Sequence, residues 1–150
     1  MSASPAIQTE PQDLVSLTKA AGEGAKALAA EATRRVRTRI LGTDGRIDAA
    51  KLEGQQHAAH GLAWLATYAE AVNELGGYAE RLQAEGRFGE TEALLVRIGA
   101  GEYLDQLLSG IPMSQGEMVR VTGSLGLSAK EVAQYRIDAV ENLIAQGNTL

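Results

Sequence analysis

The sequence contains no cysteine, and its 150 residues include one tryptophan, one phenylalanine and three prolines. A chain without cysteine has no disulfide, no thiolate zinc site and no thiol nucleophile. Aromatic residues make up 4% of the chain, and alternating runs of Val, Ile and Thr are missing, so a β-sandwich is not expected. No stretch approaches the roughly 18 consecutive apolar residues of a membrane-spanning helix. The sequence therefore predicts no membrane association.

Positive charge is scarce as well. The formal net charge is −5 at neutral pH and the pI is about 5.1, whereas nucleic-acid binders usually present a basic face. We therefore expect no nucleic-acid partner. Residues 1–10 have neither the basic start nor the apolar stretch of a secretory signal, so we expect a cytoplasmic protein with a disordered N-terminal lead-in.

Small side chains, by contrast, are abundant: the chain has 25 alanines and 17 glycines, and 45% of its residues are apolar. This length and composition predict a single all-helical domain at residues 11–150. Glycine costs about 1 kcal/mol relative to alanine inside a helix, so glycines within predicted helices indicate places where helices approach closely. These glycines are Gly54, Gly61, Gly76, Gly77, Gly99 and Gly101.

Apolar residues spaced three or four apart, with turn residues between them, predict an up-and-down bundle of four main helices plus one short helix. The main helices are expected at 11–40, from the N-cap Asp48 to about Glu85, from about Glu90 to Leu108, and at 129–146. Ser114 and Glu117 have the spacing of a capping box, which predicts the short helix through Val121. Ser128 and Glu131 repeat that spacing before the last helix.

The apolar residues of each predicted helix are expected to face the core. In the second helix, residues 61–69 carry no charge, which predicts burial on several sides. In the third helix, the residues expected inward are Leu94, Leu95, Ile98, Leu104, Leu107 and Leu108. In the last helix they are Val132, Ile137, Val140, Leu143 and Ile144.

Glu53, His57 and His60 are the side chains that most resemble a metal site. Spacings of four and three place them on one face of a helix, and His with carboxylate is a plausible ligand set for a transition metal. The sequence marks no further ligand on another helix. We therefore favour the alternative that both histidines lie in a helix interface and hydrogen-bond to neighbours such as Gln56, and no metal site is assigned.

Arg34, Arg35, Arg37 and Arg39 cluster at the end of the first predicted helix. Guanidinium groups bind phosphate well. These four, however, spread over more than one face and lie at a helix C-terminus, away from the N-terminal amides that bind anions. A solvated or interface role is the interpretation we favour, with phosphate binding as the alternative.

Other motifs point away from catalysis. The glycine pairs at 99–101 and 123–126 lack the rest of a phosphate-binding motif. Trp64 and Tyr68, one turn apart, are expected in the core or in an interface rather than as a flavin- or base-stacking platform. No Ser–His–Asp set or acid–base carboxylate pair stands out, so no catalytic residue is predicted. Gly147 and Asn148 resemble a helix C-cap near the end of the chain, as in a domain cut from a longer protein.

Three segments carry a family resemblance. They are His57-Ala-Ala-His60-Gly-Leu-Ala-Trp64-Leu-Ala-Thr-Tyr68-Ala-Glu-Ala, Gly101-Glu-Tyr-Leu104 and Gly110-Ile-Pro-Met-Ser-Gln-Gly-Glu-Met-Val-Arg120. Together they resemble the N-terminal helical extension of methylsuccinyl-CoA dehydrogenases, which are flavoenzymes of the acyl-CoA dehydrogenase superfamily in the ethylmalonyl-CoA pathway. The resemblance is close over 55–120 and is one of pattern elsewhere.

The resemblance implies an accessory helical domain that partners a dehydrogenase body on the same or a separate chain. In this family the body holds FAD, the acyl-CoA site and the catalytic glutamate, and it removes an α-proton while the β-hydride passes to the flavin. None of that body lies in these 150 residues, so no catalytic or cofactor-binding residue carries over. The implied role is structural, within a homo-oligomeric dehydrogenase of (2S)-methylsuccinyl-CoA. A free-standing helical adaptor or oligomerisation protein is the alternative.

Overall fold

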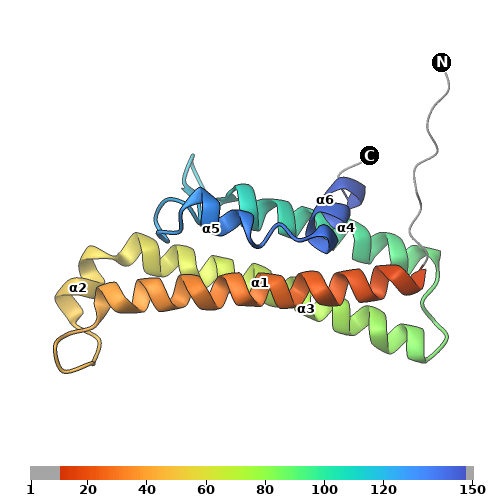
Figure 1. Cartoon of the computed structure of the whole chain (residues 1–150), viewed down its shortest axis with the longest axis horizontal. Coiled ribbons are helices and arrows are strands. Elements are labelled where there is room, and N and C mark those ends of the chain that lie inside the picture. The colour runs from red at the N-terminus through yellow and green to blue at the C-terminus, as the bar shows by residue number, and fades with distance from the viewer. Residues whose placement is uncertain (1–10, 148–150) are drawn as a thin grey trace, which may run out of the picture.

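The computed structural model describes residues 11–147, most of which are helical (Figure 1). Along the chain the elements are α1 (Pro11–Ile40), α2 (Ala49–Gly54), α3 (Gln56–Ala84), α4 (Glu90–Ser109), β1 (Ile111–Pro112), β2 (Met118–Val119), α5 (Ala129–Ala133) and α6 (Asp138–Gly147). The prediction of an all-α protein is confirmed. The lead-in expected at 1–10 and the C-cap residue Asn148 lie outside the described residues.

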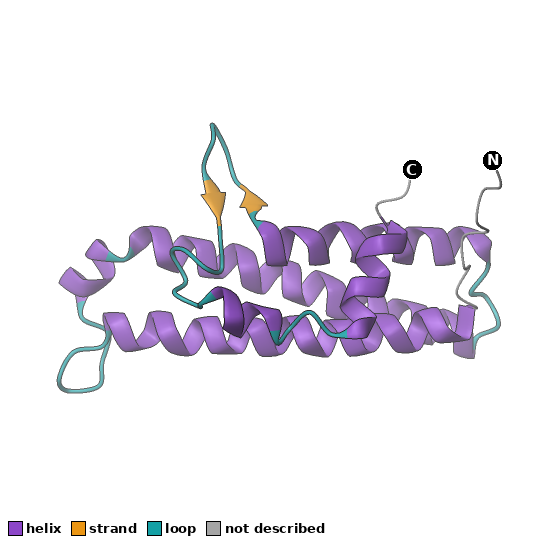
Figure 2. Cartoon of the chain, turned by 45° about the horizontal axis from the view of Figure 1, so that its top comes forward, coloured by secondary structure: helices purple, strands orange, loops and turns teal. Residues whose placement is uncertain are grey.

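Three long helices, α1, α3 and α4, lie side by side and alternate in direction (Figure 1). The C-terminal helix α6 packs on both α4 and α1, and the β1–β2 hairpin projects beyond the helices (Figure 2). Apolar residues of all these helices form one core, in which Leu14, Leu65, Leu104 and Leu143 are buried. None of the helices within 11–147 is both long and apolar enough to cross a membrane.

Small residues let the helices approach closely, as predicted. A Cβ added at Gly76 of α3 would lie 3.3 Å from the Cα of Lys19 in α1. A Cβ at Gly101 of α4 would lie 2.7 Å from the Cα of Gly147 in α6. Helices α4 and α6 therefore touch backbone to backbone at this point, and no larger side chain fits between them.

The second predicted helix is in fact two helices, α2 and α3, with a break at Gln55. Asp48 caps α2 as predicted, because its carboxylate accepts a hydrogen bond from the backbone N–H of Lys51 (3.0 Å). Gln55 has φ −119° and ψ 18°, and its N–H bonds to the carbonyl of Leu52, which ends α2. Nothing lies within 4 Å of a Cβ at Gly54, and a Cβ at Gly77 would meet only the side chain of Arg81 in the same helix, so the predictions of these two glycines as close-approach sites are wrong.

Residues 111–119 form a hairpin, and the short helix predicted from Ser114 does not form. The two strands pair antiparallel. Gln115 and Gly116 have φ values of 47° and 88°, and these left-handed conformations interrupt a helix and favour a tight turn. The N–H of Glu117 bonds back to the carbonyl of Ser114 (2.8 Å) and closes the turn. The capping-box spacing is therefore present without its helix.

The last predicted helix is also divided, into α5 and α6, by a break at 134–137. Its predicted capping box is confirmed, since the Ser128 hydroxyl accepts from the Glu131 N–H and the Glu131 carboxylate accepts from the Ser128 N–H (2.8 Å). The break has a packing reason. In a straight helix Tyr135 and Val140 would point about 140° apart, whereas here both line one small cavity against α1 and α4.

The burial pattern of α4 differs from the prediction. Leu104 and Leu107 are buried as expected. Leu94, Leu95 and Ile98, which were predicted to face the core, are exposed. The inward stripe of α4 consists of Ala93, Val96, Ala100, Leu104 and Leu107, and Leu94, Leu95 and Ile98 fall outside it.

Two further burial predictions are wrong. Within 61–69, only part of the helix is covered: Gly61, Leu65 and Ala69 are buried, whereas Ala63, Trp64, Ala66 and Thr67 are exposed. The uncharged character of this stretch therefore reflects an exposed apolar face and not burial all round. Ile137 is also exposed, because it lies in the break between α5 and α6 instead of on the inner face of a continuous helix.

Candidate functional site

The first candidate is an open hollow of about 740 Å³ where α2, α3 and the hairpin meet. Glu53, His57 and His60 all line it, together with Gln56 and Glu117. The break between α2 and α3 places Glu53 on a different helix from the two histidines. Sequence reasoning missed Glu117, because the hairpin turn and not a helical spacing brings it to this hollow.

Local hydrogen bonds already engage part of this set. The amide of Gln56 donates to Glu53 (2.7 Å), and the indole Nε1 of Trp64 donates to Nε2 of His60 (3.1 Å). A ring nitrogen that accepts this bond has no free lone pair for a metal. Among residues 11–147, no three His, Cys, Asp or Glu side chains gather in a way that could hold a metal ion. The geometry thus gives the metal hypothesis no support, and both histidines are exposed instead of lying in a helix interface.

A row of aromatic rings runs from His60 to the junction of α3 with α4. Ring centroids are 6.5 Å apart for His60 and Trp64, 6.2 Å for Trp64 and Tyr68, and 4.8 Å for Tyr68 and Tyr103. Tyr68 and Tyr103 are half-buried and pack against the core. The edge-to-face contact of Tyr68 with Tyr103 adds to the apolar burial and joins α3 to α4.

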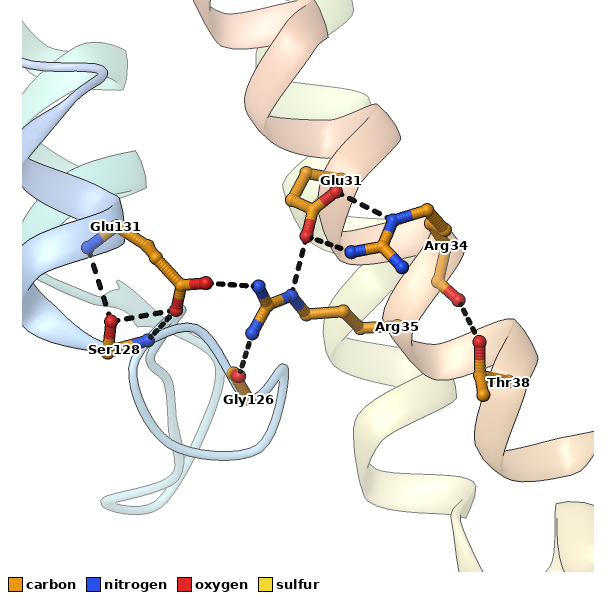
Figure 3. Close-up of polar contacts among 7 residues, drawn as sticks. All are labelled: Glu31, Arg34, Arg35, Thr38, Gly126, Ser128 and Glu131. Carbon is orange, nitrogen blue, oxygen red and sulfur yellow. Dashed lines mark hydrogen bonds and ion pairs between the residues drawn. The ribbon is translucent and has the colours of Figure 1, made fainter.

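The second candidate is the group of arginines at the end of α1, of which Figure 3 shows Arg34 and Arg35 with their partners. Arg35 donates to the carbonyl of Gly126 (2.7 Å) and to Glu31 (2.7 Å), and it forms an ion pair with Glu131. Arg34 pairs with Glu31 inside the same helix, through hydrogen bonds of 2.6 and 2.9 Å. Arg35 therefore ties α1 to the loop that precedes α5.

These contacts change the protonation behaviour of the two carboxylates. Hydrogen bonds from Arg34 and Arg35 lower the pKa of Glu31 to about 2. The backbone N–H and hydroxyl of Ser128, followed by Arg35, lower the pKa of Glu131 to about 2. The same pairs raise the pKa of both guanidinium groups. Both glutamates consequently stay ionised in moderately acidic solution and keep their contacts.

The other two arginines have different surroundings. Arg39 donates to the carbonyl of Ser124 (2.8 Å), and its guanidinium occupies the space where a Cβ at Gly126 would lie. The glycine loop is therefore packed against α1 and presents no open cradle for a phosphate. Arg37 instead lines an open hollow of about 420 Å³ with Arg46, at the end of the bundle.

The third candidate is an apolar surface on α3 and α4, which we call the outer face. It consists of Tyr78, Leu94, Leu95 and Ile98, whose exposed fractions are 36, 47, 58 and 37%. A Cβ at Gly99 would lie 3.1 Å from the Leu75 side chain, which shows that these parts of α3 and α4 are adjacent. Sequence reasoning listed most of these residues but placed the α4 group in the core.

Carboxylates border the outer face. Glu90 lies four residues before Leu94, Glu102 four after Ile98, and Glu74 four before Tyr78, and these three glutamates are exposed. Residues at this spacing share one side of a helix. Over residues 56–109 the chain has eight carboxylates and three arginines. The carboxylates are Glu70, Glu74, Glu80, Glu85, Glu90, Glu92, Glu102 and Asp105, and the arginines are Arg81, Arg87 and Arg97.

The fold and these contacts define a class: an all-α bundle whose C-terminal segment is fastened by arginine and which presents an apolar face with an acidic border. No protein-family model matches the chain. The (2S)-methylsuccinyl-CoA dehydrogenase of Cereibacter sphaeroides is 43% identical to it over 137 residues. The aligned stretch is 91% of this chain but 24% of that enzyme, so the chain spans about a quarter of the length of this relative. The resemblance to methylsuccinyl-CoA dehydrogenases is confirmed.

Proposed function

We propose that this chain is a non-catalytic accessory domain of an FAD-dependent (2S)-methylsuccinyl-CoA dehydrogenase, corresponding to an N-terminal helical extension. The observation that carries the proposal is unequal coverage: 91% of this chain aligns with a relative of which it represents 24%. Three quarters of such an enzyme remain for the dehydrogenase body. The role of this domain is therefore to pack on that body and support its assembly.

Neither the start of α4 nor the loop at Gly126 fits a flavin nucleotide. A bound pyrophosphate needs free N–H groups at a helix N-terminus or unengaged cations. At the start of α4, Glu90 and Glu92 would repel it, and the N–H of Gly89 already bonds to Glu92 (3.0 Å). The loop at Gly126 is covered by Arg39. We therefore assign FAD, the acyl-CoA site and the acid–base chemistry to the part of the dehydrogenase that this chain does not span.

Two preparations test the proposal: this chain alone, and a chimera in which it replaces the matched stretch of the C. sphaeroides enzyme. We expect the chain alone to show no flavin absorbance and no oxidation of methylsuccinyl-CoA with an artificial electron acceptor. The chimera should contain flavin and turn over. Flavin binding with turnover by the chain alone would overturn the proposal, as would an inactive chimera beside an active parent enzyme.

The alternative of a free-standing adaptor or oligomerisation protein makes a different prediction. In that case the chain alone would sediment as a monodisperse homo-oligomer, and the chimera would lose activity because the domain has no body to match. Sedimentation velocity of the chain alone and the chimera assay together separate the two functions. That the enzyme is a homo-oligomer and that it is located in the cytoplasm remain predictions.

A further inference from the structure

The outer face is an apolar surface that no other described element covers. Tyr78, Leu94, Leu95 and Ile98 each expose more than a third of their surface, and the α4 members lie within two turns of one another. Exposed apolar area costs about 25 cal/mol per Å² relative to burial, and contiguous apolar patches mark interaction sites. Helix α6 packs on α4 and α1, so the covered and exposed sides of α4 are distinct.

The border of this face shows the chemistry of its partner. Glu74, Glu90 and Glu102 are exposed beside the apolar residues, and over 56–109 the carboxylates outnumber the three arginines Arg81, Arg87 and Arg97. A carboxylate border favours lysine and arginine on the opposing surface. We infer that the outer face docks on the dehydrogenase body, through a body surface with an apolar centre and a basic border. The inference rests on the proposed function and names the face and the partner chemistry that this function requires.

A second copy of this chain is a poorer occupant. In a two-fold interface the same surface meets itself, so the carboxylates at Glu90 and Glu102 would lie against the carboxylates of the other copy. Like charges placed opposite each other at an interface are destabilising. The absent length of the relative, about three quarters of it, supplies a heterologous partner that does not face this repulsion.

The absence of native cysteine makes the test simple, because a single introduced cysteine is the only thiol of this chain. Leu95→Cys places it on the outer face, Ile98→Cys repeats the test one turn later, and Ala133→Cys, at an exposed position of α5, is the control. Each variant is made in the chain alone and in the chimera. The rate at which maleimide labels the introduced cysteine is measured by mass spectrometry of the peptide that contains it. We expect labelling of Cys variants at 95 and 98 to be about tenfold slower in the chimera, and labelling at 133 to be unchanged.

A charge test addresses the basic border. In the chimera with Leu95→Cys, the added pair Glu90→Lys and Glu102→Lys should restore fast labelling at position 95. Glu23→Lys, an equal charge change at an exposed position of α1, should not. If the acidic pair leaves the protection unchanged, the inferred basic border is wrong.

The outcomes separate the docking inference from the proposed function. An active chimera in which position 95 labels as fast as in the chain alone overturns the docking inference and leaves the proposed function standing. Slow labelling at 95 in the chain alone, together with a sedimenting dimer, overturns it in favour of a second copy. An inactive chimera counts against the proposed function itself.

Discussion

The two sides of α4 are packed in opposite ways. On the side of α6, Gly101 meets Gly147 backbone to backbone, and Leu143 is fully buried. On the outer side, Leu94 and Leu95 stand in solvent. The comparison teaches that side-chain size alone does not decide burial in this bundle: glycines mark the closest helix contact, and leucines of the same helix occupy both the core and the external surface.

The comparison is sharpest for two leucines of the same helix. Leu104→Ala should lower the free energy of unfolding by about 3 kcal/mol, because it leaves a cavity at a buried position. Leu95→Ala, at an exposed position, should change it by less than about 0.5 kcal/mol in the isolated chain. Urea unfolding followed by circular dichroism measures both. Equal losses would show that the outer side of α4 is covered in the chain alone.

The glycine contact between α4 and α6 gives the next largest effect. A Cβ in Gly101→Ala would lie 2.7 Å from both the Cα of Gly147 and the carbonyl oxygen of Leu143, so the helices must separate, at a cost of about 2 kcal/mol. Gly54→Ala is the control, because its Cβ meets open space. Thermal unfolding should show a lower Tm for the first variant and an equal or higher Tm for the second. A neutral Gly101→Ala would contradict the close contact.

The arginine contact should have a smaller, local effect. Arg35→Met removes the bonds to Gly126 and Glu131 but keeps the aliphatic stem, whereas Arg34→Met removes only bonds to Glu31 inside α1. Hydrogen exchange of residues 124–133 should become faster in Arg35→Met and stay close to the parent rate in Arg34→Met. Global unfolding should shift less than for Gly101→Ala, since this polar network is partly exposed.

Acid should loosen the contact that Arg35 and Glu131 make between α1 and the segment 124–133. The pKa of Glu131 is lowered from 4.5 to about 2, so its contribution to stability is complete above pH 4.5 and is lost as the pH falls toward 2. The protection factors of the amides at 124–133, which are corrected for the intrinsic slowing of exchange in acid, should therefore fall over this range. Glu131→Gln should remove most of this pH dependence, while the protection factors at the outer face stay unchanged. Loss of protection already above pH 5 would contradict the lowered pKa.

The sequence predicted the helical class, the first helix and the caps at Asp48 and Ser128, because these depend on local spacing and local hydrogen bonds. It failed at 111–119, where the left-handed turn at Gln115 and Gly116 replaced a helix. A Ser-x-x-Glu spacing records only that two bonds are possible, and it carries no information on the backbone conformation between the two residues.

The sites were harder to predict, because they depend on long-range packing. The buried stripe of α4 contains Ala93, Val96 and Ala100, whereas the more hydrophobic Leu94 and Leu95 lie outside it, so the choice of buried face depends on the arrangement of the other helices and not on hydrophobicity alone. The bridging role of Arg35 depends on a loop far along the chain. The sequence spacing predicted Glu53 and His57 on one helix. In the structure the break at Gln55 places them on two different helices.

The bridge made by Arg35 also has a consequence for the order of folding. Arg35 and Glu131 are 96 residues apart, whereas α3 and α4 are joined by the short connection 85–89. Closing a longer loop costs more chain entropy, and local pairs of helices form faster than distant ones. We expect the α3–α4 hairpin to form early and the C-terminal segment to attach late. The same segment should detach first when the protein opens, so that partial unfolding uncovers the sides of α1 and α4 on which α6 packs, while the outer face keeps its shape.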